Sequence, residues 1–255
     1  MEIILFILAG AAVGLAVGVT GVGGGSLMTP LLILFGFPYN VAIGTDLLYA
    51  AITKTSGMVS HSRQHSIHWN LVGYLALGSI PASLVTTLML DNVFSQPAEY
   101  EPLLTSSLGV MLILTSAVLL FRSRIKTVDS HTRANTHTRK ITVIAGILLG
   151  IFVTLSSVGA GAFCAALLMV LYPNLKARQV VGTDIAHAVP LTLIAGLGHM
   201  VFLGNVNFQL LACLLAGSLP AIHIGTRLGS RLPNKVLQPI LASVLMTIGV
   251  KFAFF

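Results

Sequence analysis

Asp46, Lys54 and Asp184 lie inside long apolar stretches of this sequence, where a charge is costly unless something compensates it. Asp46 and Asp184 each follow a Gly-Thr pair near the start of such a stretch, and Lys54 lies deeper in the first of them. A carboxylate just inside a membrane can take up and release a proton during transport. The alternative is structural, because Thr or Asp at a helix start caps unpaired backbone amides. Both interpretations stay open for the two aspartates.

The chemistry of Lys54 favours an anion contact or a carboxylate pair, although its side chain could instead extend to the nearby surface. Asp46, Tyr49 and Lys54 fall close to one helix face, at spacings of about one and two turns. His187 follows Asp184 as Tyr49 follows Asp46, so it could share a proton or bind substrate, and packing explains it equally well. The candidate substrate contacts in these two segments are Thr45, Tyr49, Lys54, Thr183 and His187.

Two glycine-rich segments interrupt apolar stretches and are suited to binding an anion. Residues 20–26 are Thr-Gly-Val-Gly-Gly-Gly-Ser, and residues 156–161 are Ser-Ser-Val-Gly-Ala-Gly. Backbone amides exposed at a helix break can form an anion nest, with hydroxyl groups as further donors. Close helix packing is the alternative, and it accounts well for Gly10, Gly14 and Gly18. The candidate anion-binding residues are Thr20, Gly23, Gly24, Gly25, Ser26, Ser156, Ser157, Gly159 and Gly161.

The elements that position these residues are membrane spans. Of the 255 residues, 55% are apolar and 8% are charged, and the mean hydropathy of +0.94 is far above that of soluble domains. The apolar blocks cover residues 3–35, 43–60, 70–90, 103–121, 141–172, 183–203, 208–226 and 236–255. Since about 20 residues cross a bilayer as a helix, the first and fifth blocks are too long and must break at their glycine segments. We expect an all-α polytopic membrane protein, with the N-terminal block retained as a span.

Charge placement orients these spans. Residues 122–140 carry six basic side chains, whereas residues 91–102 carry three acidic ones and no Lys or Arg. The positive-inside rule makes the first loop cytoplasmic and the second external. If each long block is a hairpin that returns to its own side, twelve of the fourteen basic residues are cytoplasmic and both termini are external. Full crossings would place the basic residues of 173–182 on the opposite side, against the rule.

The two halves of the chain repeat one another. Shifts of 136, 138 and 139 residues match three motifs in the same order: the glycine segments, Gly-Thr-Asp at 44–46 and 182–184, and Gly-Ser-x-Pro at 78–81 and 217–220. Under the orientation above the repeats are inverted, which is typical of secondary transporters with a midplane site between the repeats. We predict a first repeat at 1–121, a basic cytoplasmic linker at 122–140 and a second repeat at 141–255. Each repeat is a glycine-broken hairpin followed by three transmembrane helices.

The sequence resembles the sulfite exporter TauE/SafE family, also called the toluene sulfonate uptake permease family, over nearly its whole length. The resemblance lies in Gly-Val-Gly-Gly-Gly-Ser-Leu (21–27), Ile-Gly-Thr-Asp-Leu-Leu-Tyr-Ala-Ala-Ile-Thr-Lys (43–54), Val-Gly-Thr-Asp-Ile-Ala-His-Ala (181–188) and Ala-Gly-Ser-Leu-Pro (216–220). It implies secondary transport of a sulfur-containing anion, such as sulfite, thiosulfate or an organosulfonate, across the bacterial inner membrane. Substrate and direction are left open by the resemblance.

We therefore expect a secondary transporter for such an anion, coupled to protons through Asp46 and Asp184. An anion channel that uses the glycine segments as a static filter is the main alternative. An enzyme is disfavoured because the chain has no HExxH motif, Walker loop or paired nucleophile and base. Cys164 and Cys213 are expected to be packing residues, and the histidines lack metal-site spacing, so we expect no metal and no cofactor. The expected partners are the lipid bilayer, the anion and protons, with no nucleic acid; a homodimer stays open.

Overall fold

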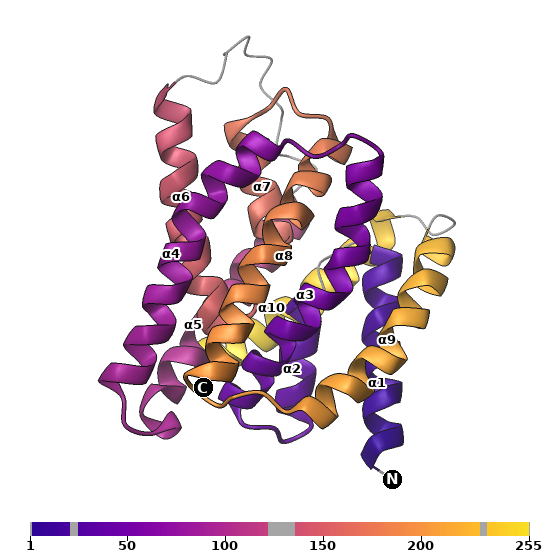
Figure 1. Cartoon of the computed structure of the whole chain (residues 1–255). Helices are drawn as coiled ribbons and strands as arrows, with labels where there is room; N and C mark the ends of the chain where they lie inside the picture. The colour runs from indigo at the N-terminus through magenta and orange to yellow at the C-terminus, as the bar shows by residue number, and fades with distance from the viewer. Residues whose placement is uncertain (1, 21–24, 122–135, 230–233, 255) are drawn as a thin grey trace.

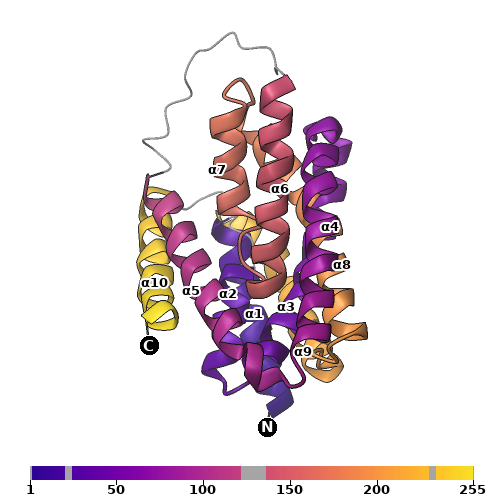
Figure 2. The ribbon, with the colours of Figure 1, turned by 90° about the vertical axis from the view of Figure 1, so that its left-hand side faces the viewer.

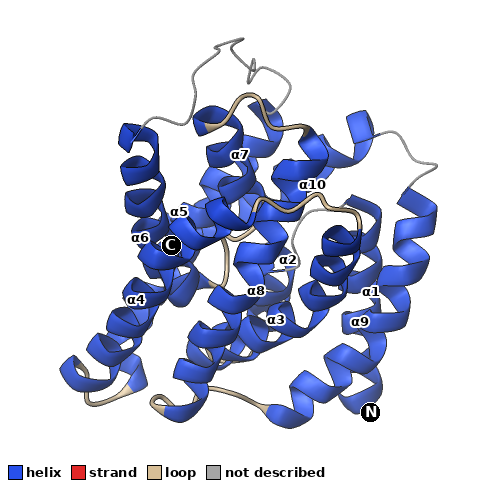
Figure 3. Ribbon diagram, turned by 45° about the horizontal axis from the view of Figure 1, so that its top comes forward, coloured by secondary structure: helices blue, strands red, loops and turns tan. Residues whose placement is uncertain are grey.

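The computed structural model describes residues 2–20, 25–121, 136–229 and 234–254, which form helices joined by short connections (Figure 1). These ranges contain no strand (Figure 3). The helices are α1 (Glu2–Thr20), α2 (Gly25–Leu34), α3 (Tyr39–Arg63), α4 (Trp69–Val93), α5 (Pro97–Phe121), α6 (Thr136–Ser156), α7 (Ala162–Leu171), α8 (Ala177–Val201), α9 (Phe208–Gly229) and α10 (Asn234–Phe254). The predicted all-α class is confirmed for the described part of the chain.

Both long apolar blocks break at their glycine segments, as predicted. The first breaks between α1 and α2, and the second between α6 and α7. Because α2 and α7 have ten residues each, each is about 15 Å long, half the thickness of a hydrocarbon core. In the second break Ser157 and Gly159 have φ angles of 57° and 118°, a left-handed backbone that ends α6. Each block is therefore a long helix followed by a helix too short to span.

The chain is a multi-pass membrane protein. Within the described residues, six helices are long and apolar enough to cross a membrane, namely α1, α4, α5, α6, α8 and α9. The helix α3 has the same length as α4, 25 residues, but its second half carries Thr53, Lys54 and Ser56 and is more polar. The helix α6 begins at Thr136, so the last residues assigned to the linker are helical, and residues 122–135 lie outside the described ranges.

Glycine lets two pairs of long helices pack at very short distance. Cβ atoms added at Gly10, Gly14 and Gly18 of α1 would overlap the backbone of α9. Cβ atoms added at Gly146 and Gly150 of α6 would overlap the backbone of α4 in the same way. Small residues at such contacts are the usual means of close helix packing in a membrane. The packing role considered for the three glycines of α1 is confirmed.

The two broken hairpins start from opposite ends of the bundle. The helix α1 starts at the end of the bundle that holds the N-terminus, whereas α6 starts at the opposite end (Figures 1 and 2). The helices α3 and α8, which follow the hairpins, pack against each other. They also contact α2 and α7, respectively, so each short helix packs beside one member of the α3 and α8 pair.

Candidate functional site

A cavity of about 570 Å³ extends from the middle of the bundle to one end. Its inner part is lined by Lys54 of α3, Gly161 before α7 and Asp184 of α8. Its outer part includes His61 and Arg227, in the last turns of α3 and α9. That end of the bundle also holds the end of α5 and the start of α6 (Figure 2). The cavity can hold a small ligand and opens toward the side that the charge pattern predicts to be cytoplasmic.

Lys54 points to the second helix break and not to the surface. Its ammonium nitrogen donates a hydrogen bond of 2.7 Å to the carbonyl oxygen of Ala160. Asp184 and Asp46 both interact favourably with its charge. Extension to the surface, one alternative for this side chain, is therefore wrong. Because Lys54 also lines the cavity, a ligand in the cavity can reach its ammonium group.

The Asp46 carboxylate links three segments that are distant in the sequence. Thr29 of α2 donates a hydrogen bond to it, and the Ser157 hydroxyl of the second break lies against it. Asp46 is the eighth residue of α3, whose N-cap is Pro38, and it is fully buried. The capping interpretation is therefore wrong at this position. Asp46 instead joins the first hairpin to the second.

Asp184, the equivalent residue of α8, lies at the floor of the cavity. It is also the eighth residue of its helix, whose N-cap is Lys176, so the capping interpretation is wrong here too. Cys164 of α7 interacts with Asp184, and its sulfur lies 3.9 Å from Nδ1 of His187. We expected Cys164 to be a packing residue only. Its neighbours come from another helix, so no local pattern in the sequence revealed them.

Tyr49 and His187 each face a serine from the other half of the chain. The Ser79 hydroxyl lies 2.8 Å from Nε2 of His187, and the Ser218 hydroxyl lies near that of Tyr49. Ser79 and Ser218 are the serines of the two Gly-Ser-x-Pro motifs. Our candidate residues did not include them, although the recurrence of that motif was a signal that could have found them.

Thr45 and Thr183 accept hydrogen bonds from the residues just before α9 and α4, and they are not among the residues that line the cavity. The hydroxyl oxygen of Thr45 accepts a hydrogen bond of 3.1 Å from the backbone N–H of Asn207, just before α9. Thr183 accepts one of 3.0 Å from the backbone N–H of His68, just before α4. Each threonine therefore fixes a turn of the other half of the chain. The structure places them outside the group that surrounds Lys54.

The second glycine break contributes backbone and hydroxyl groups to the site. Ser156 is used within the break, since its hydroxyl donates to the carbonyl oxygen of Phe152 at 2.6 Å. Gly159 accepts a hydrogen bond from the N–H of Cys164 at 3.2 Å, and Gly161 reaches the cavity.

The structure describes fewer residues of the first glycine break than of the second. Ser26 is buried in the first turn of α2. Gly23 and Gly24 lie outside the described residues, as do the side chain of Thr20 and the surroundings of Gly25.

Known proteins resemble this chain over nearly its full length. The family model "Sulfite exporter TauE/SafE" matches residues 6–252. The chain is 40% identical over 252 residues to "Probable membrane transporter protein YjnA" of Bacillus subtilis (strain 168), covering 96% of this chain and 97% of that protein. It is 28% identical over 253 residues to YdhB of the same organism, also named a probable membrane transporter protein. That match covers 95% of this chain and 99% of YdhB. For the similarly named MJ0441 of Methanocaldococcus jannaschii, identity is 24% over 263 residues, covering 96% and 93%. No solved structure matches the chain.

Proposed function

Because the chain belongs to the sulfite exporter TauE/SafE family, we propose that it is a secondary transporter for a small sulfur-containing anion. Sulfite, thiosulfate and organosulfonates form the substrate class, and the bacterial cytoplasmic membrane is the location. The observation that carries this proposal is the position of Lys54, a cation at the inner end of a cavity whose lining, among the described residues, extends to one end of the bundle. The family description names sulfite, and the relatives are named as transporters.

The inner cavity provides the groups that such an anion needs. Oxyanions bind best where a cation and N–H donors converge. Lys54 supplies the cation, and α7 begins beside it, so the positive end of the α7 dipole faces the cavity at Gly161 and Ala162. Arg227 and His61 extend the basic lining toward the mouth. We assign the first contact of the anion to Lys54 and the start of α7.

Proton coupling follows from competition for one ammonium group. Lys54 interacts electrostatically with both Asp184 and Asp46. When an anion binds Lys54, a neighbouring carboxylate loses its counter-ion in a medium of low dielectric constant. Taking up a proton then restores neutrality. Anion and proton therefore move together, with Asp46 and Asp184 as the proton carriers.

Inverted repeats at residues 1–121 and 141–255 account for the architecture. The glycine contacts of α1 with α9 recur between α6 and α4. The Tyr49 and Ser218 pair recurs as His187 and Ser79. The opposite directions of α1 and α6 (Figure 2) support the inversion. With residues 122–140 on the cytoplasmic side, we expect both termini to lie outside.

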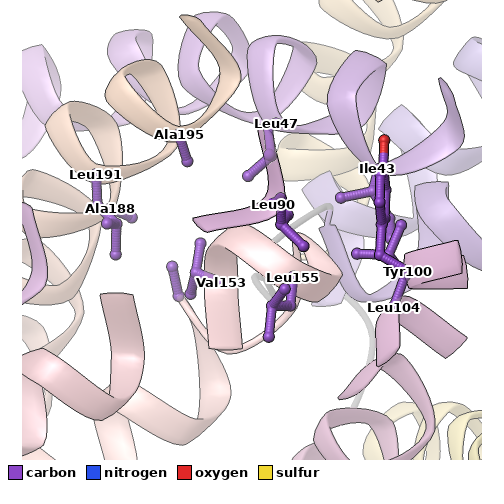
Figure 4. Close-up of a cluster of buried hydrophobic side chains, with 11 residues drawn as sticks. Ile43, Leu47, Leu90, Tyr100, Leu104, Val153, Leu155, Ala188, Leu191 and Ala195 are labelled. Carbon is purple, nitrogen blue, oxygen red and sulfur yellow. The ribbon is translucent and has the colours of Figure 1, made fainter. Parts of the chain in front are cut away.

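A carrier is favoured over the anion channel because the cavity is closed at its inner end. A channel needs a continuous path, whereas beyond Lys54 the bundle is filled by a buried cluster that includes Leu47, Leu104 and Leu191 (Figure 4). Alternating access needs such a closed half in each conformation.

The test uses purified protein in liposomes. Uptake of labelled sulfite, thiosulfate and methanesulfonate is measured with and without a pH gradient. Saturable uptake that the gradient accelerates supports the proposal. Flux that rises linearly with concentration supports the channel instead, and absence of flux for all three anions overturns both.

A further inference from the structure

The open cavity has a buried counterpart in the other half of the molecule. Three polar side chains of the cavity recur unchanged after the repeat shifts of 138 and 139 residues: Asp184 as Asp46, His61 as His199, and Thr226 as Thr87. The three counterparts are 0%, 0% and 1% exposed, respectively. One copy of each of these polar residues is thus open to the cavity, and the other copy is enclosed.

The apolar lining of the cavity shows the same relationship. Five members of one buried cluster are the counterparts of cavity-lining residues (Figure 4). In the order cavity residue and counterpart, the pairs are Val17 and Val153, Thr53 and Leu191, Gly57 and Ala195, Val181 and Ile43, and Ile185 and Leu47. This cluster therefore fills the space that corresponds, in the other half, to the open cavity.

His199 is incompletely bonded in its enclosed position. Its Nε2 lies 3.0 Å from the carbonyl oxygen of Thr154. Its Nδ1 is buried with no hydrogen-bond partner in the described part of the chain. A buried imidazole nitrogen without a partner is unfavourable, so its presence points to a second conformation in which water or a ligand reaches it.

We infer that the alternate conformation opens an external vestibule at this cluster, lined by Asp46, Thr87 and His199. At the same time the present cavity closes over Asp184, Thr226 and His61, because inverted repeats exchange their conformations during transport. The inference rests on the proposed function. The counterparts of Lys54 and Arg227 are Thr192 and Leu88, so among these counterparts His199 is the basic side chain that an anion meets from outside.

Thiol labelling from the external side tests this vestibule. Thr87→Cys is prepared with Cys213→Ala, and a membrane-impermeant maleimide is added to right-side-out vesicles. Thr115→Cys is the matched control, since Thr115 is also buried, at 2% exposure, but is no counterpart of a cavity residue. We expect Thr87→Cys to react at least about tenfold faster than Thr115→Cys, because a minor conformation is populated to some per cent. Ser83→Cys, the counterpart of cavity-lining Ile222, is the second reporter if Thr87→Cys does not fold.

A substitution that blocks the cavity tests whether opening of the vestibule is coupled to closure of the cavity or occurs independently of it. A Cβ on Gly57 meets only Ile185, at 3.6 Å, so Gly57→Trp fills the inner cavity and prevents its closure. We expect Gly57→Trp to abolish external labelling of Thr87→Cys. Labelling that is unchanged by Gly57→Trp, or equal to that of Thr115→Cys, overturns the vestibule even where liposomes still carry the anion. Loss of anion flux with the labelling pattern intact overturns the proposed function and leaves the vestibule standing.

Discussion

The ammonium nitrogen of Lys54 and the carbonyl oxygen of Ala160 lie 2.7 Å apart, although 106 residues separate them in the chain. The contact fixes the middle of α3 against the second helix break. A carbonyl group is neutral, so this hydrogen bond orients the lysine without cancelling its charge. The charge is therefore held at the place where an anion in the cavity would arrive.

Replacing Lys54 tests the anion contact. We expect Lys54→Met to lower the kcat/KM of anion uptake in liposomes by about 10- to 150-fold, the equivalent of a charged hydrogen bond of about 1.5–3 kcal/mol. Lys251→Met is the matched control, since Lys251 lies exposed in the last turn of α10. Unchanged uptake by Lys54→Met, with normal yield of folded protein, would show that the anion binds elsewhere.

Replacing Asp184 tests proton coupling. We expect Asp184→Asn to retain anion binding but to lose the acceleration of uptake by a pH gradient, because an amide cannot carry the proton. The measurement is the initial rate of uptake with and without the gradient. Asp91→Asn, at an exposed position near the end of α4, should behave as the wild type. A full response to the gradient in Asp184→Asn would contradict its role as a proton carrier.

The glycine contacts of α1 predict that adding a single methyl group at one of these glycines lowers the stability of the protein. Gly10→Ala places a methyl group against the backbone of α9, and overpacking of this kind costs about 1–3 kcal/mol. We expect a lower Tm in detergent. The measurement is the amount of monodisperse protein that size-exclusion chromatography finds after heating to each temperature. Gly73→Ala is the control, because a Cβ at Gly73 meets nothing within 4 Å; its Tm should be equal or slightly higher. Equal losses in both variants would refute the packing role.

The turn contact of Thr183 predicts an effect on stability and none on substrate affinity. Thr183→Val removes the acceptor for the N–H of His68, at a cost of about 1 kcal/mol for the partly buried donor left unpaired. We expect a lower Tm with an unchanged KM for uptake, and recovery in Thr183→Ser, which keeps the hydroxyl. A raised KM together with an unchanged Tm would show that Thr183 contacts the substrate.

The sequence alone was sufficient to predict the order and type of the helices. Apolar blocks of known length, and glycine segments that cannot continue a helix, are local properties, so they predicted α1, α2, α6 and α7 correctly. Recurring motifs pointed to Asp46, Asp184 and their neighbours for the same reason. The capping role was wrong because α3 and α8 begin two turns earlier than the motifs suggested.

What only the tertiary structure decided is which half contacts which. Lys54 meets Ala160, His187 meets Ser79, and Thr45 meets the turn before α9. These contacts depend on how α3 and α8 cross between the two hairpins, and no spacing along the chain records that crossing. The sequence determined two similar halves with similar polar residues. The packing decided that one copy of each polar residue is open to a cavity while the other copy is enclosed, because the helices pack closely around Asp46 and His199 and leave space beside Asp184 and His61.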